Sequence, residues 1–185
     1  MKTRHVRLTI LFLLFLFGAC KESTTGPEIS VNLIANGNFE IDQTPTLQGW
    51  VPGSAQLAEL VNEAPQGGGN WALELTADWA PTMGFVYTPI LSVASGDIVE
   101  LSAFVRAIGQ EGGGSIELRT GESIWTATRS TARTSDTAWT QLTLVDTLNL
   151  GLNDTVWVVL SSFETELIPK KGLFDLITLK RTNSQ

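Results

Sequence analysis

Residues 32–50 read NLIANGNFEIDQTPTLQGW, and the fold of the chain can be inferred from this stretch. A short apolar run, 31–34, precedes a polar corner at 36–38, whose Asn-Gly pair is a strong turn signal because both residue types tolerate a positive φ. Phe39 and Trp50 stand on either side of the polar loop that follows, and both are large enough to begin a hydrophobic core. The stretch therefore predicts a strand, a tight turn and a core contact that closes a loop.

The rest of the chain reads as short strands separated by turns. Glycine- and asparagine-containing segments such as 65–69, 112–114 and 151–154 interrupt apolar and β-branched runs. The strands predicted in this way are 56–61, 71–77, 84–93, 98–107, 115–120, 123–129, 138–148, 155–163 and 173–180. Because the sequence shows no helical period of useful length, the pattern indicates an all-β protein, folded as an antiparallel β-sandwich.

Alternation of residue types assigns faces to these strands. In 98–107 the odd-numbered residues Val99–Val105 are apolar, whereas the even-numbered residues Glu100–Arg106 mix one aromatic with polar groups, so the odd row is expected in the core. The same reasoning directs Ile116, Leu118 and Ile124 inward, and Glu117, Arg119, Trp125 and Arg129 outward. Neighbouring outward rows of this kind predict one sheet face that is both polar and aromatic.

These motifs resemble the carbohydrate-binding modules of the CenC type (families 4, 9 and 22), which are galactose-binding-like jelly rolls. The opening stretch is similar to their N-L-x-x-N-G-x-F-E followed by G-W, and 91–106 is similar to a central motif that ends in L-S-x-x-v-R. Residues 139–142 resemble a W-x-x-L strand start, and 174–179 resemble a closing f-D-D-v-x-l strand with Leu176 in place of the second aspartate. The resemblance implies a jelly roll over 31–181 that binds a polysaccharide or oligosaccharide.

The resemblance also implies a structural calcium ion. In these modules the ion is held at the edge of the sandwich by oxygens of the N-terminal F-E and the closing aspartate, which correspond here to Glu40 and Asp175. Calcium takes about six to eight oxygen ligands, so backbone carbonyls near Asn38 or Gly172 are further candidate donors. The alternative interpretation is that Glu40 is a surface acid and Asp175 a turn residue at a strand end.

The tryptophans separate into core candidates and ligand-binding candidates, because sugar recognition uses aromatic faces that stack on the pyranose ring. The core candidates are Trp50, Trp71 and Trp139. Trp157 could have either role. By the resemblance Trp79 matches a ligand-stacking tryptophan, and Trp125 faces outward by alternation. Further candidates for polar or stacking ligand contacts are Tyr87, Arg119 and Glu164. The alternative for each is a loop anchor or a solvated surface residue.

The start of the chain predicts export and a lipid anchor. A basic head is followed by the apolar run 8–17 and by Gly-Ala-Cys at 18–20, which fits a secretory signal and resembles a bacterial lipobox. Since Lys21 rather than an aspartate follows the cysteine, an outer-membrane or cell-surface address is expected. The alternative is an ordinary signal peptide cut nearby. The expected boundaries are a signal peptide at 1–19, a lipidated Cys20 and flexible tether at 20–30, the domain at 31–181 and a tail at 182–185.

Composition excludes several functions for the domain. The single histidine, His5, and the single cysteine, Cys20, belong to the expected leader and lipid anchor, which removes Ser-His-Asp and Cys-His catalysis and histidine-rich zinc sites. The formal net charge is −7, which disfavours a nucleic-acid partner. Paired carboxylates are the remaining catalytic device, and nothing in the sequence singles out a pair, so we expect a protein that is not an enzyme.

The sequence therefore predicts a lipid-anchored protein of the cell envelope that binds glycan through an aromatic and polar face. The alternative is a structural or interaction lipoprotein that binds another envelope protein or a cell-wall component. Exposure of Trp79 and Trp125 along one groove would favour glycan, and their burial would favour the protein partner.

Overall fold

The computed structural model describes residues 30–53, 57–77, 84–109, 112–163 and 170–182. The predicted lipidation site Cys20 and two predicted ligand residues, Trp79 and Glu164, lie outside these ranges. Within the described ranges the named elements are all β-strands, and no helix is long and apolar enough to cross a membrane. The predicted all-β fold is confirmed.

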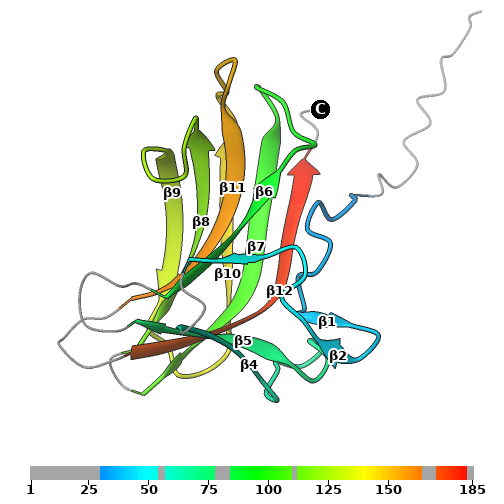
Figure 1. The fold of residues 1–185 in the computed structure, drawn as a ribbon, viewed down its shortest axis with the longest axis vertical. Helices are drawn as coiled ribbons and strands as arrows, with labels where there is room; N and C mark the ends of the chain where they lie inside the picture. The colour runs from blue at the N-terminus through cyan, green and yellow to red at the C-terminus, as the bar shows by residue number, and fades with distance from the viewer. Residues whose placement is uncertain (1–29, 54–56, 78–83, 110–111, 164–169, 183–185) are drawn as a thin grey trace, which may run out of the picture.

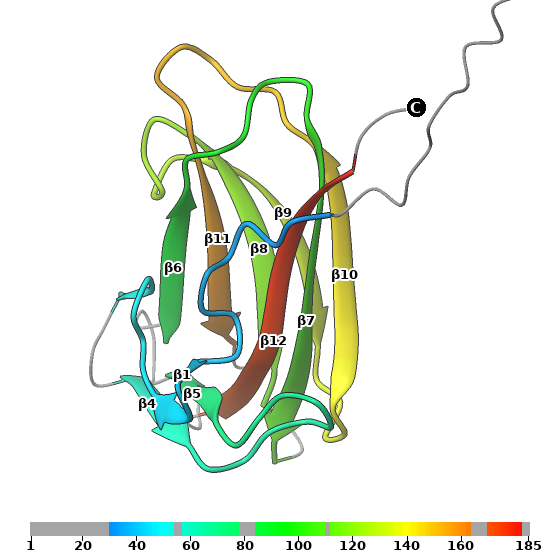
Figure 2. The ribbon, with the colours of Figure 1, turned by 90° about the vertical axis from the view of Figure 1, so that its right-hand side faces the viewer.

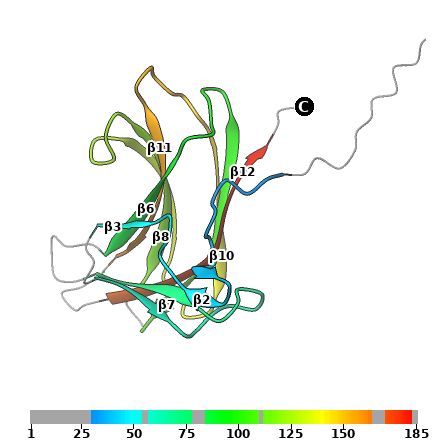
Figure 3. The ribbon, with the colours of Figure 1, turned by 45° about the vertical axis from the view of Figure 1, so that its right-hand side comes forward.

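Two five-stranded antiparallel sheets pack face to face as a β-sandwich, as Figure 1 and the perpendicular view in Figure 2 show. The first, here the β7 sheet, has the order β10 (Thr140–Thr147), β7 (Ile98–Ile108), β12 (Lys170–Thr182), β5 (Ala72–Ala77), β4 (Ala58–Val61). The second, here the β8 sheet, has the order β3 (Val51–Pro52), β6 (Phe85–Ile90), β11 (Thr155–Ser162), β8 (Gly114–Gly121), β9 (Thr128–Thr134). A small hairpin, β1 (Glu40–Ile41) and β2 (Thr44–Pro45), lies beside them. Figure 3 shows β6, β8 and β11 together in one layer.

The hydrophobic core lies between the two sheets, as the alternation predicts. Val99, Leu101 and Val105 of β7 are fully buried, and Ile116 and Leu118 of β8 belong to the same apolar cluster. Burial of each such side chain stabilises the fold by roughly 1.5 to 3 kcal/mol. A chain with a single cysteine has no intramolecular disulfide, so this core carries the stability of the domain.

The opening stretch makes the predicted core contact. Phe39 and Trp50 are both buried, and their ring centroids lie 5.6 Å apart. The indole Nε1 of Trp50 donates a 2.8 Å hydrogen bond to the carbonyl of Asn36. In turn, the side-chain amide of Asn36 donates to the carbonyls of Thr46 and Gln48, at 2.9 and 3.1 Å. The asparagine therefore ties both ends of the loop together.

The positive φ expected in the Asn-Gly corner lies elsewhere. It falls on Phe39, at 55°, and not on Asn36, Gly37 or Asn38. Gly37 is required for close approach instead: a Cβ atom there would lie 1.9 Å from the carbonyl oxygen of Ile177. The N–H of Ile177 donates a 2.7 Å hydrogen bond to the carbonyl of Gly37, which fixes the two backbones against each other.

We expect Gly37→Ala to lower the free energy of unfolding by about 2 kcal/mol, because the backbone of β12 must move to admit the methyl group. The measurement is urea unfolding followed by tryptophan fluorescence. Gly151→Ala is the matched control, since its Cβ would meet only the half-buried side-chain carboxylate of Asp154, at 3.2 Å, and no backbone atom. Equal stability of the two variants would contradict this assignment.

A β-bulge interrupts β12. Asp175 pairs with Phe104 and Thr178 with Ser102, so that two residues of β12, Leu176 and Ile177, oppose a single residue of β7. Leu176 has a φ of 52°, and the extra residue reverses the alternation of the strand. As a result Phe174 and Ile177 both reach the core.

The segment that precedes the opening loop lies beside the last residues of β12. The N–H of Leu33 donates to the carbonyl of Leu179 at 2.8 Å. The side-chain oxygen of Asn32 accepts hydrogen bonds from the N–H groups of Leu179 and Ile34, at 2.9 and 3.1 Å. The first described residues are therefore bonded to the end of the closing strand.

Three predictions about the outer strands and tryptophans are wrong. Residues 123–127 lie outside the strands, and β9 begins at Thr128. Ile124, predicted in the core, is buried on the outer face of the β8 sheet instead. Trp71 and Trp139 are half-buried rather than in the core. The ring of Trp139 lies 5.6 Å from the guanidinium carbon of Arg106, so it contacts this arginine rather than the apolar core.

Candidate functional site

Three rows of side chains cross the outer face of the β8 sheet. Because Ile116 and Leu118 of β8 face the core, the residues between them face outward. The strand registers align Phe85, Ser161, Ser115 and Arg133 in the first row, Tyr87, Val159, Glu117 and Thr131 in the second, and Pro89, Trp157, Arg119 and Arg129 in the third. The predicted polar and aromatic sheet face is therefore present, with its aromatic residues toward β6 and its arginines toward β9.

The loop between β8 and β9 folds over the aromatic half of this face. Ile124 is buried against Trp157 and Val159, and the rings of Phe85 and Tyr87 pack on the same cluster. The centroids of Phe85 and Tyr87 are 6.3 Å apart. This explains how an apolar side chain outside the main core can be buried, and among the described residues nothing covers the β8–β9 half of the face in the same way.

Trp125 stands at the rim of this covered half. Its side chain is 70% exposed. The prediction that it faces outward is therefore correct. Its ring meets that of Phe85 edge-on, with centroids 5.5 Å apart and an interplanar angle of 89°. One face of the indole is thus held in place while much of the ring stays in contact with solvent.

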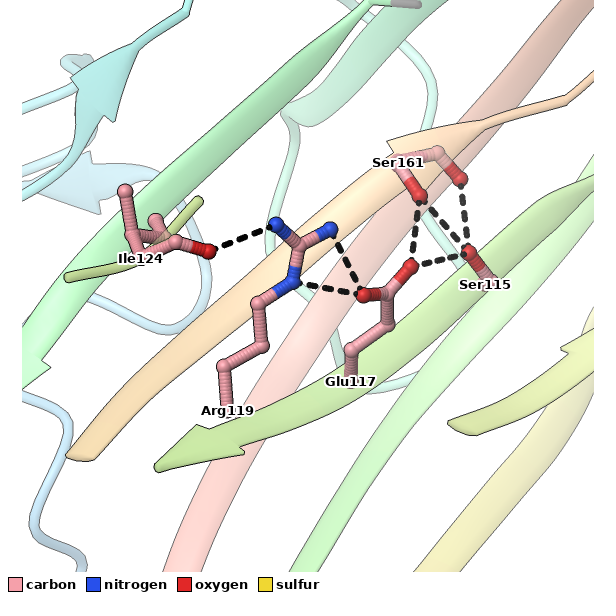
Figure 4. A network of polar contacts seen from close by, with 5 residues as sticks. All are labelled: Ser115, Glu117, Arg119, Ile124 and Ser161. Atoms are coloured by element: carbon pink, nitrogen blue, oxygen red, sulfur yellow. Dashed lines mark hydrogen bonds and ion pairs between the residues drawn. The ribbon is translucent and has the colours of Figure 1, made fainter. Parts of the chain in front are cut away.

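Glu117 is the centre of a buried polar network, shown in Figure 4. One carboxylate oxygen, Oε2, accepts hydrogen bonds from Nε and Nη2 of Arg119, both at 2.8 Å. The other, Oε1, has the hydroxyls of Ser115 and Ser161 at 3.5 and 3.3 Å. Arg119 also donates from Nη1 to the carbonyl of Ile124 at 3.2 Å, which fastens the covering loop to the sheet. The pair therefore neutralises its own charge and positions the loop.

A groove of about 350 Å³ opens on the uncovered half of the face. It is lined by Ser115, Glu117, Arg129, Thr131, Arg133 and Phe163. The lining alternates along β9, because Arg129, Thr131 and Arg133 point outward while Ala132 packs against the core. At one end the guanidinium of Arg133 lies 5.7 Å from the centroid of the Phe163 ring. The groove thus combines hydroxyls, a carboxylate, two arginines and one aromatic ring.

The predicted ligand residues that the structure describes do not come together in the groove. Arg119 lies on the outer face but is engaged with Glu117 and the loop, and Tyr87 is packed in the covered aromatic cluster. Trp125 stands at the rim, and neither it, Arg119 nor Tyr87 lines the groove. Trp79 and Glu164 lie outside the described residues.

Sequence reasoning missed four residues that line the groove: Ser115, Thr131, Arg133 and Phe163. The cause is the misplaced strand at 123–129, because β9 runs instead from Thr128 to Thr134. The signal was present in the alternation of residues 129–133, where two arginines flank an outward threonine. Reading the strand from that alternation would have placed both arginines on one face.

The two predicted metal ligands meet at the edge of the sandwich, against the glycine-rich segment 67–69. Asp175 is fully buried, and its Oδ1 accepts a 2.7 Å hydrogen bond from the N–H of Leu176, whereas its Oδ2 has no partner among the described residues. Glu40 Oε1 accepts a 2.8 Å bond from the N–H of Asn70. Burial, with the nearby charge of Glu40 adding to it, raises the pKa of Asp175 to about 7 despite the Leu176 hydrogen bond.

Glycines leave room beside both carboxylates. A Cβ atom at Gly68 would lie 1.9 Å from Asp175 Oδ2, and one at Gly69 would lie 1.9 Å from Glu40 Oε2. A buried carboxylate oxygen without a partner, a second carboxylate nearby and backbone in close approach suit an oxygen-seeking cation. Among the described residues no third acidic, histidine or cysteine side chain joins them, so further ligands would be neutral oxygens or water. The prediction that Glu40 and Asp175 come together is consistent with this geometry.

Comparison with known proteins finds no family model and no curated protein that match the chain. Solved structures are similar to it. One is described as "Family 16 Carbohydrate Binding Module-2", with a TM-score of 0.60 and 21% identity over 80% of this chain and 99% of that one. Another is the CBM22-1 xylan-binding domain from Paenibacillus barcinonensis, with a TM-score of 0.58 and 14% identity over 84% of this chain and 97% of that one. A third is TmCBM61, solved in complex with β-1,4-galactotriose, with a TM-score of 0.54 and 13% identity over 83% of this chain and all of that one.

At these identities the likeness establishes the fold. The chain has the β-sandwich jelly roll of carbohydrate-binding modules, as its motifs indicated. Each of the three structures is matched over nearly its whole length.

Proposed function

We propose that the protein is a non-catalytic glycan-binding protein and that its ligand lies in the groove on the β8 sheet. The observation that carries this proposal is the groove itself, in which hydroxyl, carboxylate and guanidinium groups line a concave surface bordered by an aromatic ring. Such groups orient sugar hydroxyls, and rings stack on the apolar face of a pyranose. Two of the similar structures support the ligand class, since one is described as xylan-binding and one holds a galactotriose.

Trp125 is the second aromatic contact in this proposal. It stands on the loop that borders the groove, and its exposed indole is held edge-on by Phe85. A sugar chain longer than the groove would meet this ring as it leaves the β8–β9 half of the face. The predicted role of Trp125 in binding is therefore kept, and the role of Arg119 becomes that of positioning the loop.

We expect Thr131→Trp to abolish glycan binding, because the indole would fill the centre of the groove. The measurement is affinity electrophoresis or isothermal titration of the purified protein against β-glucans, xylans, mannans and galactans. Thr143→Trp is the matched control, since Thr143 is an exposed threonine on the outward face of β10, on the other sheet. We expect a loss of at least about tenfold in affinity for the groove variant, equal to more than about 1.4 kcal/mol, and none for the control.

Absence of binding to every polymer would contradict the proposal. In that case the same face would be examined with envelope proteins, the alternative that the sequence leaves open. Binding that Thr131→Trp leaves unchanged would place the ligand site elsewhere on the sandwich.

We propose further that Glu40 and Asp175 hold a structural calcium ion. The support is the orphaned Oδ2 of Asp175, the second carboxylate and the room that Gly68 and Gly69 leave beside them. The ion would offset the cost of burying an ionised carboxylate and would stabilise the edge of the sandwich; it would take no part in binding sugar.

Lipid anchoring at Cys20 and a place at the outer membrane or cell surface complete the proposal. Their support is the basic, apolar and small-residue pattern at the start of the sequence. In this arrangement the polar segment 21–30 would act as a tether. Mass spectrometry of the membrane fraction would detect acyl chains on Cys20, and Cys20→Ala should release the protein from the membrane.

A further inference from the structure

Positive charges exceed unpaired negative ones in the groove, whereas the protein as a whole is acidic, with a net charge of −7. Glu117 is buried and neutralised by Arg119 through two hydrogen bonds. Arg129 and Arg133 remain, and among the described residues no carboxylate lies within ion-pairing distance of either. Within the described part of the chain, the groove therefore carries two positive charges without a carboxylate partner.

Other arginines of the domain are paired. Arg106 forms an ion pair with Glu63 at 2.5 Å, and Arg181 forms one with Asp97 at 3.0 Å. In a chain where acidic residues outnumber basic ones, 19 to 12, carboxylate partners are plentiful. The two arginines without such a partner in the described structure are the two that line the groove.

Their geometry suits an extended anionic ligand. Arg129 and Arg133 lie on the same face of β9 with Thr131 between them, so their Cα atoms are roughly 13 Å apart along the strand. The guanidinium of Arg133 is steadied by the ring of Phe163, and that ring lies against Gly113, where a Cβ atom would be 2.3 Å from it. A planar guanidinium held in this way can donate two parallel hydrogen bonds to a carboxylate or sulfate group.

We propose that the groove binds an acidic polysaccharide and that Arg129 and Arg133 contact its carboxylate or sulfate groups. This inference rests on the proposed function and narrows its ligand class. The guanidinium groups can donate hydrogen bonds to the hydroxyls of a neutral glycan, but their positive charges strengthen those bonds only when the acceptor is an anionic group. The negative charge of the rest of the protein repels a polyanion, so the acidic chain is bound at the groove and not elsewhere on the surface.

The test compares acidic polymers with neutral counterparts of the same backbone. Polygalacturonate, alginate and glucuronoxylan are each paired with their carboxyl-reduced form, and a sulfated galactan is paired with its desulfated form. Isothermal titration of the purified protein at low and high salt gives the affinity for each. We expect at least one acidic polymer to bind about tenfold or more tightly than its neutral form, with an advantage that shrinks as salt is raised. The carboxylate and sulfate arms distinguish the two sources of charge.

Variants locate the effect in the groove. We expect Arg129→Gln and Arg133→Gln each to weaken binding of the acidic polymer by about tenfold and binding of its neutral form by clearly less, because glutamine keeps an amide donor for sugar hydroxyls but loses the positive charge. Lys180→Gln is the control for net charge, because Lys180 lies on β12, where its neighbour Leu179 faces the core and Lys180 faces outward from the β7 sheet. It should change neither affinity.

The outcomes separate this inference from the proposed function. Equal binding of acidic and neutral polymers, with both arginine variants unaffected, would overturn the acidic ligand while glycan binding stands. An acidic preference that survives both substitutions would overturn the role of these arginines. Failure of every polymer to bind would overturn the proposed function, and the acidic ligand with it.

Discussion

Replacing Arg119 by alanine is expected to lower the free energy of unfolding by about 3 kcal/mol, because it leaves the carboxylate of Glu117 buried without a counter-charge. The side chain of Glu117 is 6% exposed and that of Arg119 is 17% exposed, so solvent screens little of their attraction. The substitution also removes the hydrogen bond from Arg119 to the carbonyl of Ile124, which holds the covering loop. Urea unfolding gives the loss of stability.

The control for this prediction is the double variant Arg119→Ala with Glu117→Gln. It removes the arginine but leaves no uncompensated charge, so we expect it to recover a substantial part of the lost stability. Both variants lose the loop contact and should expose the cluster around Trp157 to a similar degree. A double variant as unstable as the single one would mean that the loop contact, and not the ion pair, carries the energy.

Asp175 is expected to make the calcium-free domain less stable as the pH rises from about 4 to about 7. Burial raises the pKa of its carboxyl from the ordinary 3.8 to about 7. Below pH 3.8 the carboxyl is protonated in both the folded and the unfolded state, so its titration does not change the free energy of unfolding. As the pH rises the unfolded state loses its proton first, so unfolding becomes more favourable, and the loss levels off above about pH 7. For this fully buried carboxyl, a pKa shift of this size corresponds to roughly 4 kcal/mol of unfolding free energy.

The measurement is the difference in unfolding free energy between Asp175→Asn and the unchanged protein, in chelator, across this pH range. The asparagine does not titrate, so the variant should gain stability relative to the unchanged protein as the pH rises. Asp42→Asn is the matched control, because Asp42 is an exposed aspartate in the turn between β1 and β2. A difference that does not depend on pH would contradict a buried, protonated Asp175.

Calcium should reverse this penalty at neutral pH. At a free concentration about a hundred times its dissociation constant, the ion would add about 2.7 kcal/mol, which corresponds to a rise in melting temperature of about 5 to 10 °C for a domain of this size. We expect the gain to disappear in Asp175→Asn and to persist in Asp42→Asn. A melting temperature that calcium leaves unchanged in the parent protein would contradict a calcium ion at this site.

The sandwich could be predicted from the sequence because alternation is a local property. The rows around Val99 and Leu118 place apolar groups on one face whatever the rest of the chain does, and both rows lie in the core. The β-bulge in β12 and the positive φ at Phe39 could not be predicted in the same way, because tertiary contacts impose them. The positive φ predicted for the Asn-Gly corner was wrong for the same reason. Gly37 is there because the backbone of Ile177 leaves no space for a side chain, and not because the turn requires a positive φ.

The candidate site could be predicted only in part. The outward face of β8 follows from alternation, but a charged residue such as Glu117 is normally exposed. Its burial goes with the polar network that it forms with Arg119, Ser115 and Ser161. Arg133 and Phe163 come together from β9 and from the residue after β11, and no local pattern brings them into one groove. Glu40 and Asp175 are far apart in the sequence, and only the resemblance to known modules joined them.

Under the proposed lipid anchoring, the contact between residues 32–34 and β12 has a mechanical consequence. The first row of the groove face lies at the Gly172 end of β12, while Asn32 pairs with Lys180 about eight residues, or roughly 26 Å, further along the strand. Tension between a captured polymer and a tether ahead of residue 30 would therefore run along the length of the sandwich. The bonds of Asn32 and Leu33 to Leu179 lie across that direction, so they would be sheared together instead of peeled apart one by one.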